Sequence, residues 1–284
     1  MIRDIDMSAK TIGVSKDLSA QLERTEVEAW SDFCSAAPRD AVETCGLRLT
    51  QTESSCFSIV PCVDTLAFNR GIGVGVNEPV TEAVLDKAIA LYEQADVGRF
   101  FIQLVPDALT PEVKRLLKRK GFQHYNNWVK LYRDTIPMPP VDTDLRVEEI
   151  STREASVFAN ILINSFEWSE ILQSWVEKTV GRPRWRHYMA FDGNTPVATG
   201  ALYVAGRFGW IDFASTLPAA RGRGAQSALL ELRVADAARE GCKWLVVETA
   251  EDTPQKPAPS FRNMIRHGFQ VAYVRPNYIR HFDK

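Results

Sequence analysis

The two halves of this sequence end in the same order of predicted elements, and this repetition limits the folds that the chain can adopt. In each half an amphipathic helix precedes an apolar strand, a proline-bearing loop, a short helix and the tripeptide Gly-Phe-Gln, which opens an aromatic strand. The tripeptides are Gly121-Phe122-Gln123 and Gly268-Phe269-Gln270. The preceding segments are 80–95, 100–105, 106–110 and 111–120 in the first half, and 224–240, 244–249, 254–259 and 260–267 in the second. The matching order indicates an ancient duplication.

A proline-rich segment separates the two halves. Residues 134–144 contain Pro137, Pro139 and Pro140, which exclude a helix and favour an extended, exposed connection. A chain of 284 residues is also long enough for two domains. We therefore predict a first domain at 1–136, a linker at 137–144 and a second domain at 145–284.

The second domain has the pattern of an α+β protein. Its predicted elements are a strand at 145–150, helices at 153–164 and 168–180, and strands at 185–191, 196–204 and 208–215. The turn signals Asp192-Gly193-Asn194 and Ala205-Gly206-Arg207 join the last three strands. Antiparallel strands followed by alternating helices and strands predict a mixed, mostly antiparallel sheet flanked by helices.

The composition excludes several classes of protein. A formal net charge of −2 with scattered Lys and Arg gives no positive field for phosphate polymers, so we expect no nucleic-acid partner. No stretch approaches the ~18 consecutive apolar residues of a membrane span, and residues 1–6 are too polar and acidic for a signal peptide. We therefore expect a cytoplasmic protein with no membrane partner.

The cysteines give no sign of a metal or disulfide framework. Five cysteines are an odd number without a CxxC pair, and only four histidines accompany them. We expect no metal site and reduced, mostly buried thiols. A catalytic cysteine would need a positive neighbour that the sequence does not locate.

The sharpest motif links a predicted strand to a predicted helix within residues 216–227. Gly222 and Gly224 stand at the N-terminus of the helix, where free main-chain N–H groups and the helix dipole suit a diphosphate. The glycines allow close approach of the backbone, and Arg221 and Arg223 add positive charge. The alternative interpretation is a glycine-rich turn with solvated arginines. The Walker and Rossmann nucleotide-binding patterns are absent.

This segment resembles the motif of the GNAT superfamily of N-acetyltransferases, which reads Arg or Gln, two residues, Gly, one residue, then Gly or Ala. Arg221 and Gly224 occupy the first two fixed positions, and Pro218 stands where such proteins commonly carry a proline after the fourth strand. Gln226 departs from the last position, although its amide side chain can donate a hydrogen bond. The resemblance extends over about 144–278 as an order of elements, and it implies tandem GNAT-like domains with a degenerate first copy.

The resemblance also implies where coenzyme A lies. In the family, the fourth and fifth strands splay apart, and the pantetheine arm runs between them like an additional strand. In this chain, Glu248 and Thr249 would stand on the fifth strand at the level of this gap. The motif and the resemblance together assign the cofactor to Ser215, Thr216, Arg221, Gly222, Arg223, Gly224, Ala225, Gln226, Ser227, Thr249 and Asn263.

The first half contains no such motif. Aligning the two Gly-Phe-Gln tripeptides places residues 74–77 opposite 221–224, with Glu78 and Pro79 where a phosphate would need donors. The Glu78 carboxylate repels an anion, and Pro79 has no N–H group. We predict one acetyl-CoA per chain, with the first domain packing against the second and shaping the acceptor cleft.

Acyl transfer to an amine needs a base, an oxyanion donor and a proton for the departing thiolate. Asp212 lies on the strand where the family often places a carboxylate base and is the first candidate, followed by Glu248. Many family members protonate the thiolate with a Tyr, but Met264 occupies that position here. Tyr273 and Tyr278 on the final strand are therefore the remaining candidates. Each of these side chains also fits a purely structural role on a strand.

These observations predict an N-acetyltransferase that moves an acetyl group from acetyl-CoA to a small-molecule or peptide amine by direct attack in a ternary complex. One alternative is an acyltransferase that uses another acyl-CoA or an aminoacyl donor. Another is a catalytically silent sensor that binds acyl-CoA, which the missing tyrosine favours. Turnover distinguishes these hypotheses.

Overall fold

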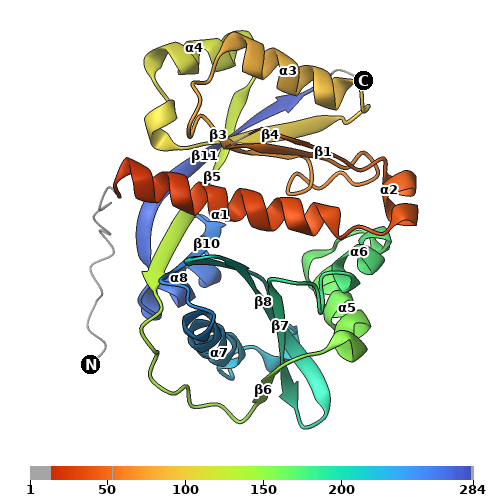
Figure 1. Cartoon of the computed structure of the whole chain (residues 1–284), viewed down its shortest axis with the longest axis vertical. Helices are drawn as coiled ribbons and strands as arrows, with labels where there is room; N and C mark the ends of the chain where they lie inside the picture. The colour runs from red at the N-terminus through yellow and green to blue at the C-terminus, as the bar shows by residue number, and fades with distance from the viewer. Residues whose placement is uncertain (1–13, 53, 283–284) are drawn as a thin grey trace.

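The computed structural model describes residues 14–52 and 54–282 (Figure 1). The first half contains α1 (Lys16–Ser35), α2 (Arg39–Cys45), β1 (Arg48–Gln51), β2 (Cys56–Ile59), β3 (Arg70–Val74), α3 (Glu82–Glu93), β4 (Arg99–Leu104), η1 (Pro106–Ala108), α4 (Pro111–Arg119) and β5 (Gln123–Asp134). The second half contains β6 (Arg146–Glu149), η2 (Thr152–Glu154), α5 (Ala155–Phe166), η3 (Glu170–Leu172), α6 (Gln173–Glu177), β7 (Trp185–Asp192), β8 (Thr195–Ala205), β9 (Phe208–Thr216), η4 (Pro218–Ala220), α7 (Ala225–Arg239), β10 (Trp244–Ala250), α8 (Pro259–Arg266) and β11 (Gln270–His281).

All of these strands form one 11-stranded sheet, in the order β1-β2-β3-β4-β11-β5-β10-β9-β8-β7-β6. Within the described residues, β3 pairs with β4 and β9 pairs with β10 in parallel, while the other neighbouring strands are antiparallel. Helices flank this sheet, so the predicted α+β class with a mostly antiparallel sheet is confirmed.

The two halves exchange their last strands at the centre of the sheet. β11 of the second half lies between β4 and β5 of the first, and β5 lies between β11 and β10. On either side of the β5–β11 pair, β4-β3-β2-β1 corresponds in order to β10-β9-β8-β7, as expected for a duplicated unit, and β6 is an additional strand. Residues 135–143 after β5 form neither helix nor strand. The division into two domains at this segment stays a prediction, because the sheet continues across both halves.

Within residues 14–52 and 54–282, three hydrophobic cores fill the space between the sheet and the helices. The α1 core joins α1, α5 and α6 to the sheet, the α7 core involves α7 and α8, and the α3 core involves α3 and α4. Trp210 of β9 belongs to the α1 core and its neighbour Ile211 belongs to the α7 core. Because successive side chains of a strand point to opposite faces, the α1 and α7 cores lie on opposite faces of the sheet.

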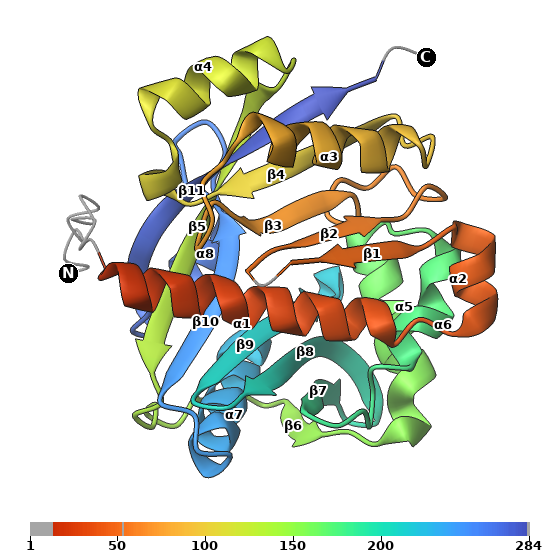
Figure 2. The same cartoon turned by 45° about the horizontal axis from the view of Figure 1, so that its top comes forward.

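Helix α1 connects the two halves on one face of the sheet. Figure 2 shows it crossing in front of β5, β10 and β9, and it contacts β2 and β3 of the first half as well as β8, β9 and β10 of the second. Ser15 caps this helix by accepting a hydrogen bond from the Leu18 N–H at 3.2 Å. Part of the first half therefore covers the strands that carry the motif of the second.

The cysteine prediction is partly wrong. Cys45 and Cys62 form a disulfide, whereas Cys34, Cys56 and Cys242 are free and buried. The chain segments at the end of α2 and after β2 bring the paired Cα atoms to 4.7 Å, and the sequence pattern contains no sign of this proximity.

None of the helices in the described part of the chain is long and apolar enough to span a membrane. The prediction made from residues 1–6 concerns a segment outside the described residues.

Candidate acyl-donor site

A wedge opens between the parallel strands β9 and β10. The two strands pair from Trp244↔Phe208 to Val246↔Trp210, and beyond that point the described residues of 211–216 and 247–250 do not pair with each other. On its other edge, β10 pairs with β5 as far as Ala250↔Trp128. The facing edges of β9 and β10 are thus left with main-chain groups that can bind an extended ligand.

A β-bulge in β9 lies beside this wedge. The register with β8 shifts between Thr199 and Ala201, and Phe213 adopts a positive φ of 51°. The Thr199 hydroxyl donates to the Phe213 carbonyl at 2.8 Å, and the Phe213 N–H donates to the Asp212 Oδ1 at 2.7 Å. A non-glycine residue with positive φ needs such support, because the conformation is sterically unfavourable. Sequence analysis missed this bulge.

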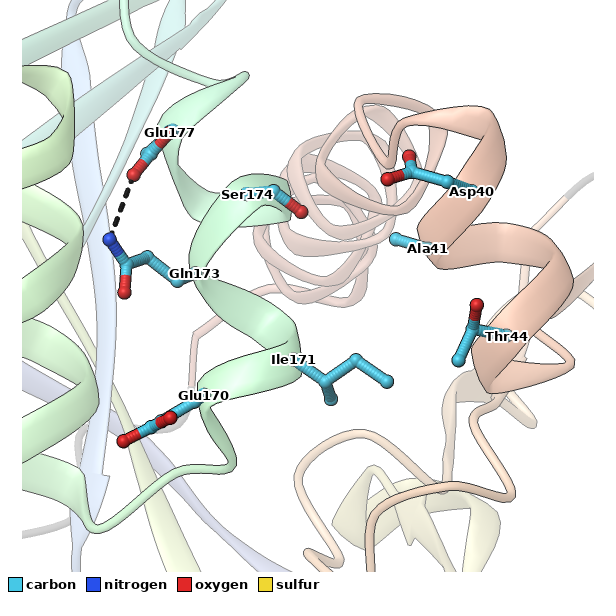
Figure 3. Close-up of a pocket in the computed structure, with 8 residues that line it drawn as sticks. All are labelled: Asp40, Ala41, Thr44, Glu170, Ile171, Gln173, Ser174 and Glu177. Atoms are coloured by element: carbon cyan, nitrogen blue, oxygen red, sulfur yellow. Dashed lines mark hydrogen bonds between the residues drawn. The ribbon is translucent and has the colours of Figure 1, made fainter.

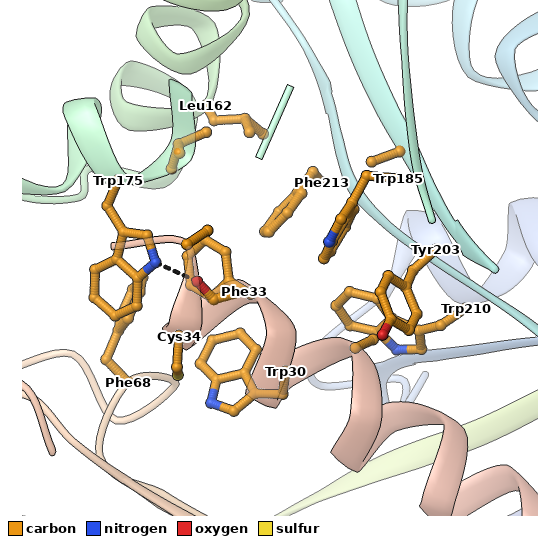
Figure 4. Packing of buried hydrophobic residues seen from close by; sticks show 14 of the residues in the cluster. Trp30, Phe33, Cys34, Phe68, Leu162, Trp175, Trp185, Tyr203, Trp210 and Phe213 are labelled. Atoms are coloured by element: carbon orange, nitrogen blue, oxygen red, sulfur yellow. Dashed lines mark hydrogen bonds between the residues drawn. The ribbon is translucent and has the colours of Figure 1, made fainter. Parts of the chain in front are cut away.

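Aromatic packing holds the bulge against α1. The Phe213 ring stacks on Trp185 with centroids 5.7 Å apart and meets Phe33 of α1 at 5.3 Å. Trp175 of α6 stacks on Phe33 at 4.7 Å, and its indole N–H donates to the Phe33 carbonyl (Figure 4). The first half therefore fixes the backbone of β9 next to the wedge.

The turn after β9 leads directly into the N-terminus of α7. Gly222 and Gly224 have φ values of 82° and 84°, and Gly224 is the N-cap residue. A Cβ atom at Gly222 would meet nothing within 4 Å, whereas one at Gly224 would lie 3.2 Å from the Asp142 carbonyl oxygen. In this described segment no side chain caps α7 and no acidic residue stands in its first turn. The helix end is thus open to an anion.

Arg221 and Arg223 differ in their contacts: only Arg223 forms ion pairs with neighbouring carboxylates. Arg221 is exposed, and its Nε donates to the Thr216 carbonyl at 3.3 Å. Arg223 forms ion pairs with Asp144 and Asp192, each at 2.5 Å. Hydrogen bonds from Arg223 raise the acidity of both carboxyl groups and hold their pKa values below the ordinary range. The charge of Arg223 is therefore already neutralised, and Arg221 is the arginine left for an anionic ligand.

The Gln226 side chain joins α7 to the strands. Its Nε2 donates to the Ser215 carbonyl at 2.7 Å, the Thr199 carbonyl at 3.1 Å and the Thr216 hydroxyl at 3.1 Å. Gln226, which departs from the family pattern, thus donates hydrogen bonds as its amide group allows. Its acceptors are protein groups rather than a ligand.

Ser215 offers a buried hydroxyl group without a protein partner. Its side chain is 7% exposed, and its Oγ has no hydrogen-bond partner among the described residues. Thr249, on the opposite side of the wedge, donates to the Ala250 carbonyl at 3.1 Å. Because buried polar atoms are normally paired, the Ser215 hydroxyl fits a site that a polar ligand completes.

Two further cofactor candidates meet between α7 and α8. Ser227 Oγ lies 3.5 Å from Asn263 Oδ1 and 2.7 Å from His267 Nε2. Burial lowers the pKa of His267, and the neighbouring Arg266 and Arg133 add to this effect. Sequence analysis did not place His267 in the site, although its position at the end of α8 made contact with α7 possible.

Asp212 is a partly buried carboxyl group on the α1 face of β9. Burial raises its pKa to about 7, and Glu248 adds to the rise while the Phe213 N–H opposes it. A carboxyl group with such a pKa exchanges its proton near neutral pH, as a general base requires.

Glu248 belongs to a cluster of buried charges, which we call the charge cluster. Its members are Glu23 and Glu26 of α1, Arg70 of β3, Lys130 of β5, Glu248 of β10 and Arg275 of β11. The Glu248 side chain is 10% exposed and the others are at most 3% exposed. Burial raises the pKa of Glu248, and Arg275, Lys130 and Arg70 oppose this rise. No sequence pattern indicated the cluster.

The two tyrosines lie on β11, which β5 separates from β10. The Tyr273 hydroxyl donates to Glu23 Oε1 at 2.6 Å, and burial together with Glu23 raises its pKa well above the ordinary value. Tyr278 packs against the α3 core, and burial raises its pKa. The structure therefore does not bring either tyrosine to the wedge.

The equivalent position in the first half differs in three ways. The parallel strands β3 and β4 remain paired as far as Val74↔Leu104. Thr81 caps α3 by accepting a hydrogen bond from the Val84 N–H, and Glu82 stands in the first turn. The helix end is thus capped and carries a carboxylate, which opposes an anion.

A surface cavity of about 330 Å³ lies elsewhere, between α2 and α6 (Figure 3). Its lining residues are Asp40, Ala41, Thr44, Glu170, Ile171, Gln173, Ser174 and Glu177. None of these residues belongs to β9, β10 or α7, so the cavity is separate from the wedge. No group of three or more His, Cys, Asp or Glu side chains suited to a metal occurs in 14–52 and 54–282.

The wedge, the bulge and the uncapped helix N-terminus lie together where β9 leads into α7. Residues 151–269 match the sequence model of the acetyltransferase (GNAT) family. Residues 151–269 are therefore a GNAT domain, from a family that transfers acyl groups from acyl-CoA. No curated protein matches the sequence.

Several solved structures match almost the whole chain. A GCN5-related N-acetyltransferase from Kribbella flavida aligns with a TM-score of 0.61 at 14% identity, over 96% of this chain and 97% of that protein. A GCN5-related N-acetyltransferase from Sphaerobacter thermophilus gives 0.59 at 13% identity, over 95% and 94%. A tandem GNAT protein from the clavulanic acid biosynthesis pathway gives 0.58 at 13% identity, over 93% and 94%. The chain therefore has the tandem GNAT fold.

Proposed function

We infer that this protein is an N-acetyltransferase that transfers the acetyl group of acetyl-CoA to the amine of a small molecule or peptide. The observation that carries the proposal is the wedge between β9 and β10, which adjoins the uncapped N-terminus of α7. A linear cofactor with an anionic end needs both features, because its arm requires main-chain partners and its diphosphate requires N–H donors.

The residues around the helix end fit the diphosphate of acetyl-CoA. Gly222 leaves open space in front of the turn, and the exposed Arg221 supplies a positive charge. The main-chain N–H groups of Gly224, Ala225 and the following first-turn residues Gln226 and Ser227 complete the proposed donor set. Arg223 acts indirectly, because its ion pairs hold the turn against the linker and the β7–β8 hairpin.

The residues around the wedge fit the pantetheine arm. Ser215 contributes a buried unpartnered hydroxyl from β9, with Thr216 next to it, and Thr249 lies on the unpaired part of β10. Asn263 and Ser227 lie where α7 and α8 meet and bind the arm through their polar side chains. These assignments extend the sequence prediction to groups that the structure brings together.

Asp212 acts as the base in the proposed reaction. The thioester supplies an activated acetyl group, and the amine nitrogen attacks its carbonyl carbon. The new C–N bond forms as the C–S bond breaks, and the nitrogen loses one proton to the Asp212 carboxylate, directly or through water. Protonated Asp212 then returns this proton through water to the departing thiolate, which leaves as the free thiol. The raised pKa of Asp212 suits this exchange near neutral pH. Glu248 is the second candidate for the base, because it lies on β10 at the level of Asp212 on β9.

The first half binds no second cofactor in this proposal. Paired strands, the Thr81 cap and the Glu82 carboxylate at the start of α3 all oppose an acyl-CoA at that position. The expected stoichiometry is one acetyl-CoA per chain, which isothermal titration calorimetry measures directly.

The test of the binding site is a thermal-shift experiment with acetyl-CoA. At 100 times its Kd the ligand stabilises the wild type by about 2.7 kcal/mol, so the melting temperature rises measurably. We expect the double variant Arg221→Glu/Gly224→Val to lose this rise, because it places a carboxylate and a bulky side chain at the helix end. Gly206→Val is the matched control. Gly206 has a φ of 61° in the β8–β9 turn, so this variant destabilises the fold but keeps the response to acetyl-CoA.

Turnover is the second part of the test. An amine library assayed with acetyl-CoA and thiol detection is expected to yield at least one acceptor. An unchanged thermal response in the double variant would contradict the binding site. Binding without turnover on any amine would instead identify a silent acyl-CoA sensor.

A further inference from the structure

We propose that Arg70, a residue of the first half, is a positioning residue that holds Glu248 and tunes the carboxylate pair Asp212 and Glu248 of the second half. This inference rests on the proposed function of Asp212 as the base. It assigns the first half, which has no cofactor motif of its own, a direct influence on the chemistry.

The contacts of Arg70 join the two halves at the level of the wedge. Its Nη1 lies 2.9 Å from Glu248 Oε1 on β10 and 3.2 Å from Glu26 Oε1 on α1. It also donates to Gln103 Oε1 at 3.1 Å. These bonds place the Glu248 side chain on the α1 face of the sheet, the same face as Asp212.

The surroundings of Arg70 fix the guanidinium group rather than leaving it mobile. The guanidinium carbon lies 4.2 Å from the ring centroid of Trp30 and 5.3 Å from that of Trp128. The side chain is 3% exposed, and its Nε has no hydrogen-bond partner among the described residues. A buried, planar cation between two aromatic rings makes a stable anchor for a carboxylate.

The charge cluster around Arg70 contains equal numbers of carboxylates and cations. The charge cluster contains three carboxylates and three cations, so an ionised Asp212 adds a fourth negative charge. The charges that act on Asp212 are Glu248, Arg70 and Glu26 on the α1 face and Arg233 of α7. Glu248 itself pairs with Arg70, Lys130 and Arg275. Removing one member therefore changes the charge that both carboxyl groups experience.

Arg70 and Glu26 have opposite effects on the pKa values of Asp212 and Glu248. Arg70 lowers the pKa of Asp212 and of Glu248, whereas Glu26 raises both. We therefore expect Arg70→Met to move the acidic limb of the pH profile of kcat/KM to higher pH, on the order of one pH unit. Glu26→Gln is expected to move it to lower pH. Arg70→Lys keeps the charge and restores most of the wild-type midpoint.

Two readouts separate positioning from a merely structural role. Acetyl-CoA affinity is expected to stay within about twofold in these variants, because the helix end that binds the diphosphate is separate from the charge cluster. Arg99→Met is the matched control. Arg99 lies on neighbouring β4 in a surface pair with Asp64, and its loss is expected to leave the midpoint unchanged.

A titration that needs no turnover completes the experiment. The carboxyl carbon of Asp212 in protein labelled with ¹³C-aspartate, assigned with Asp212→Asn, reports its pKa by NMR. Movement in opposite directions in Arg70→Met and Glu26→Gln supports the proposal, even if no amine is acetylated and the proposed function fails. If Arg70→Met does not fold, Glu26→Gln and Arg70→Lys carry the test. An unmoved titration in the folded variants overturns it.

Discussion

Replacing Asp212 by asparagine tests the environment of this carboxyl group through the stability of the protein. Burial raises the pKa of Asp212 from its ordinary value of 3.8 to about 7. Ionising the group in the folded state therefore costs about 4 kcal/mol, since each pKa unit corresponds to about 1.36 kcal/mol. Asparagine has nearly the same shape and stays neutral, and its side-chain oxygen can still accept the hydrogen bond from the Phe213 N–H.

The sign of the effect follows from the two protonation states. Below pH 3.8 Asp212 is neutral in both folded and unfolded protein, so its favourable contribution is fully present. As the pH rises from 3.8 to about 7, the unfolded chain releases this proton while the folded protein retains it, and that contribution is lost. The asparagine of Asp212→Asn is neutral at every pH, so the variant does not lose this stability as the pH rises. The variant is expected to match the wild type near pH 3.5 and to be more stable by about 4 kcal/mol at pH 8.

Urea denaturation at a series of pH values between 3.5 and 8.5 measures this difference. The carboxyl groups away from Asp212 titrate alike in both proteins, so the difference in unfolding free energy reports Asp212 and its interaction with Glu248. In parallel, kcat is expected to fall by about 10²–10⁴-fold while acetyl-CoA still binds. A stability difference that does not change with pH would refute the raised pKa. Wild-type turnover in the variant would remove Asp212 from the mechanism.

Two further predictions concern the turn and the disulfide. Arg223→Ala removes the ion pairs with Asp144 and Asp192, so urea denaturation is expected to show a loss of about 1 kcal/mol. Its acetyl-CoA affinity should change less than about threefold, and a much larger loss would mean that Arg223 contacts the ligand. Reduction of the disulfide between Cys45 and Cys62, which are 17 residues apart, is expected to lower the unfolding free energy by about 3 kcal/mol. A double Cys→Ser variant should show no further loss with dithiothreitol.

Periodic segments of the sequence predicted their elements closely. The helix expected at 224–240 is α7 (Ala225–Arg239), and the strand expected at 244–249 is β10 (Trp244–Ala250). Both have uninterrupted patterns of apolar residues between clear turn signals. The anion motif was equally visible, because glycines at a strand-to-helix junction leave a local signature that does not depend on distant contacts.

Helix α1 was not predicted, although it begins at a Ser15 cap and carries Leu22, Ala29 and Phe33 at helical spacing. Its buried face also contains Glu23 and Glu26, which interrupt the apolar pattern. Their partners come from the strands β3, β5 and β11, which lie far apart in the sequence, so no local signal explains why two carboxylates are buried. The charge cluster and its influence on Asp212 therefore required the structure.

The exchange of strands gives the first half a role in building the site that does not depend on a cofactor of its own. β10 is paired along its length with β5, from Trp244↔Asp134 to Ala250↔Trp128. This pairing holds one side of the wedge in place after β10 has parted from β9. Without β5, the same strand would have two open edges at the level of Glu248, and its position would depend on the ligand alone. The first half thus supplies the strand that keeps the wedge open and, through Arg70 and Glu26, the charges that face the carboxylates within it.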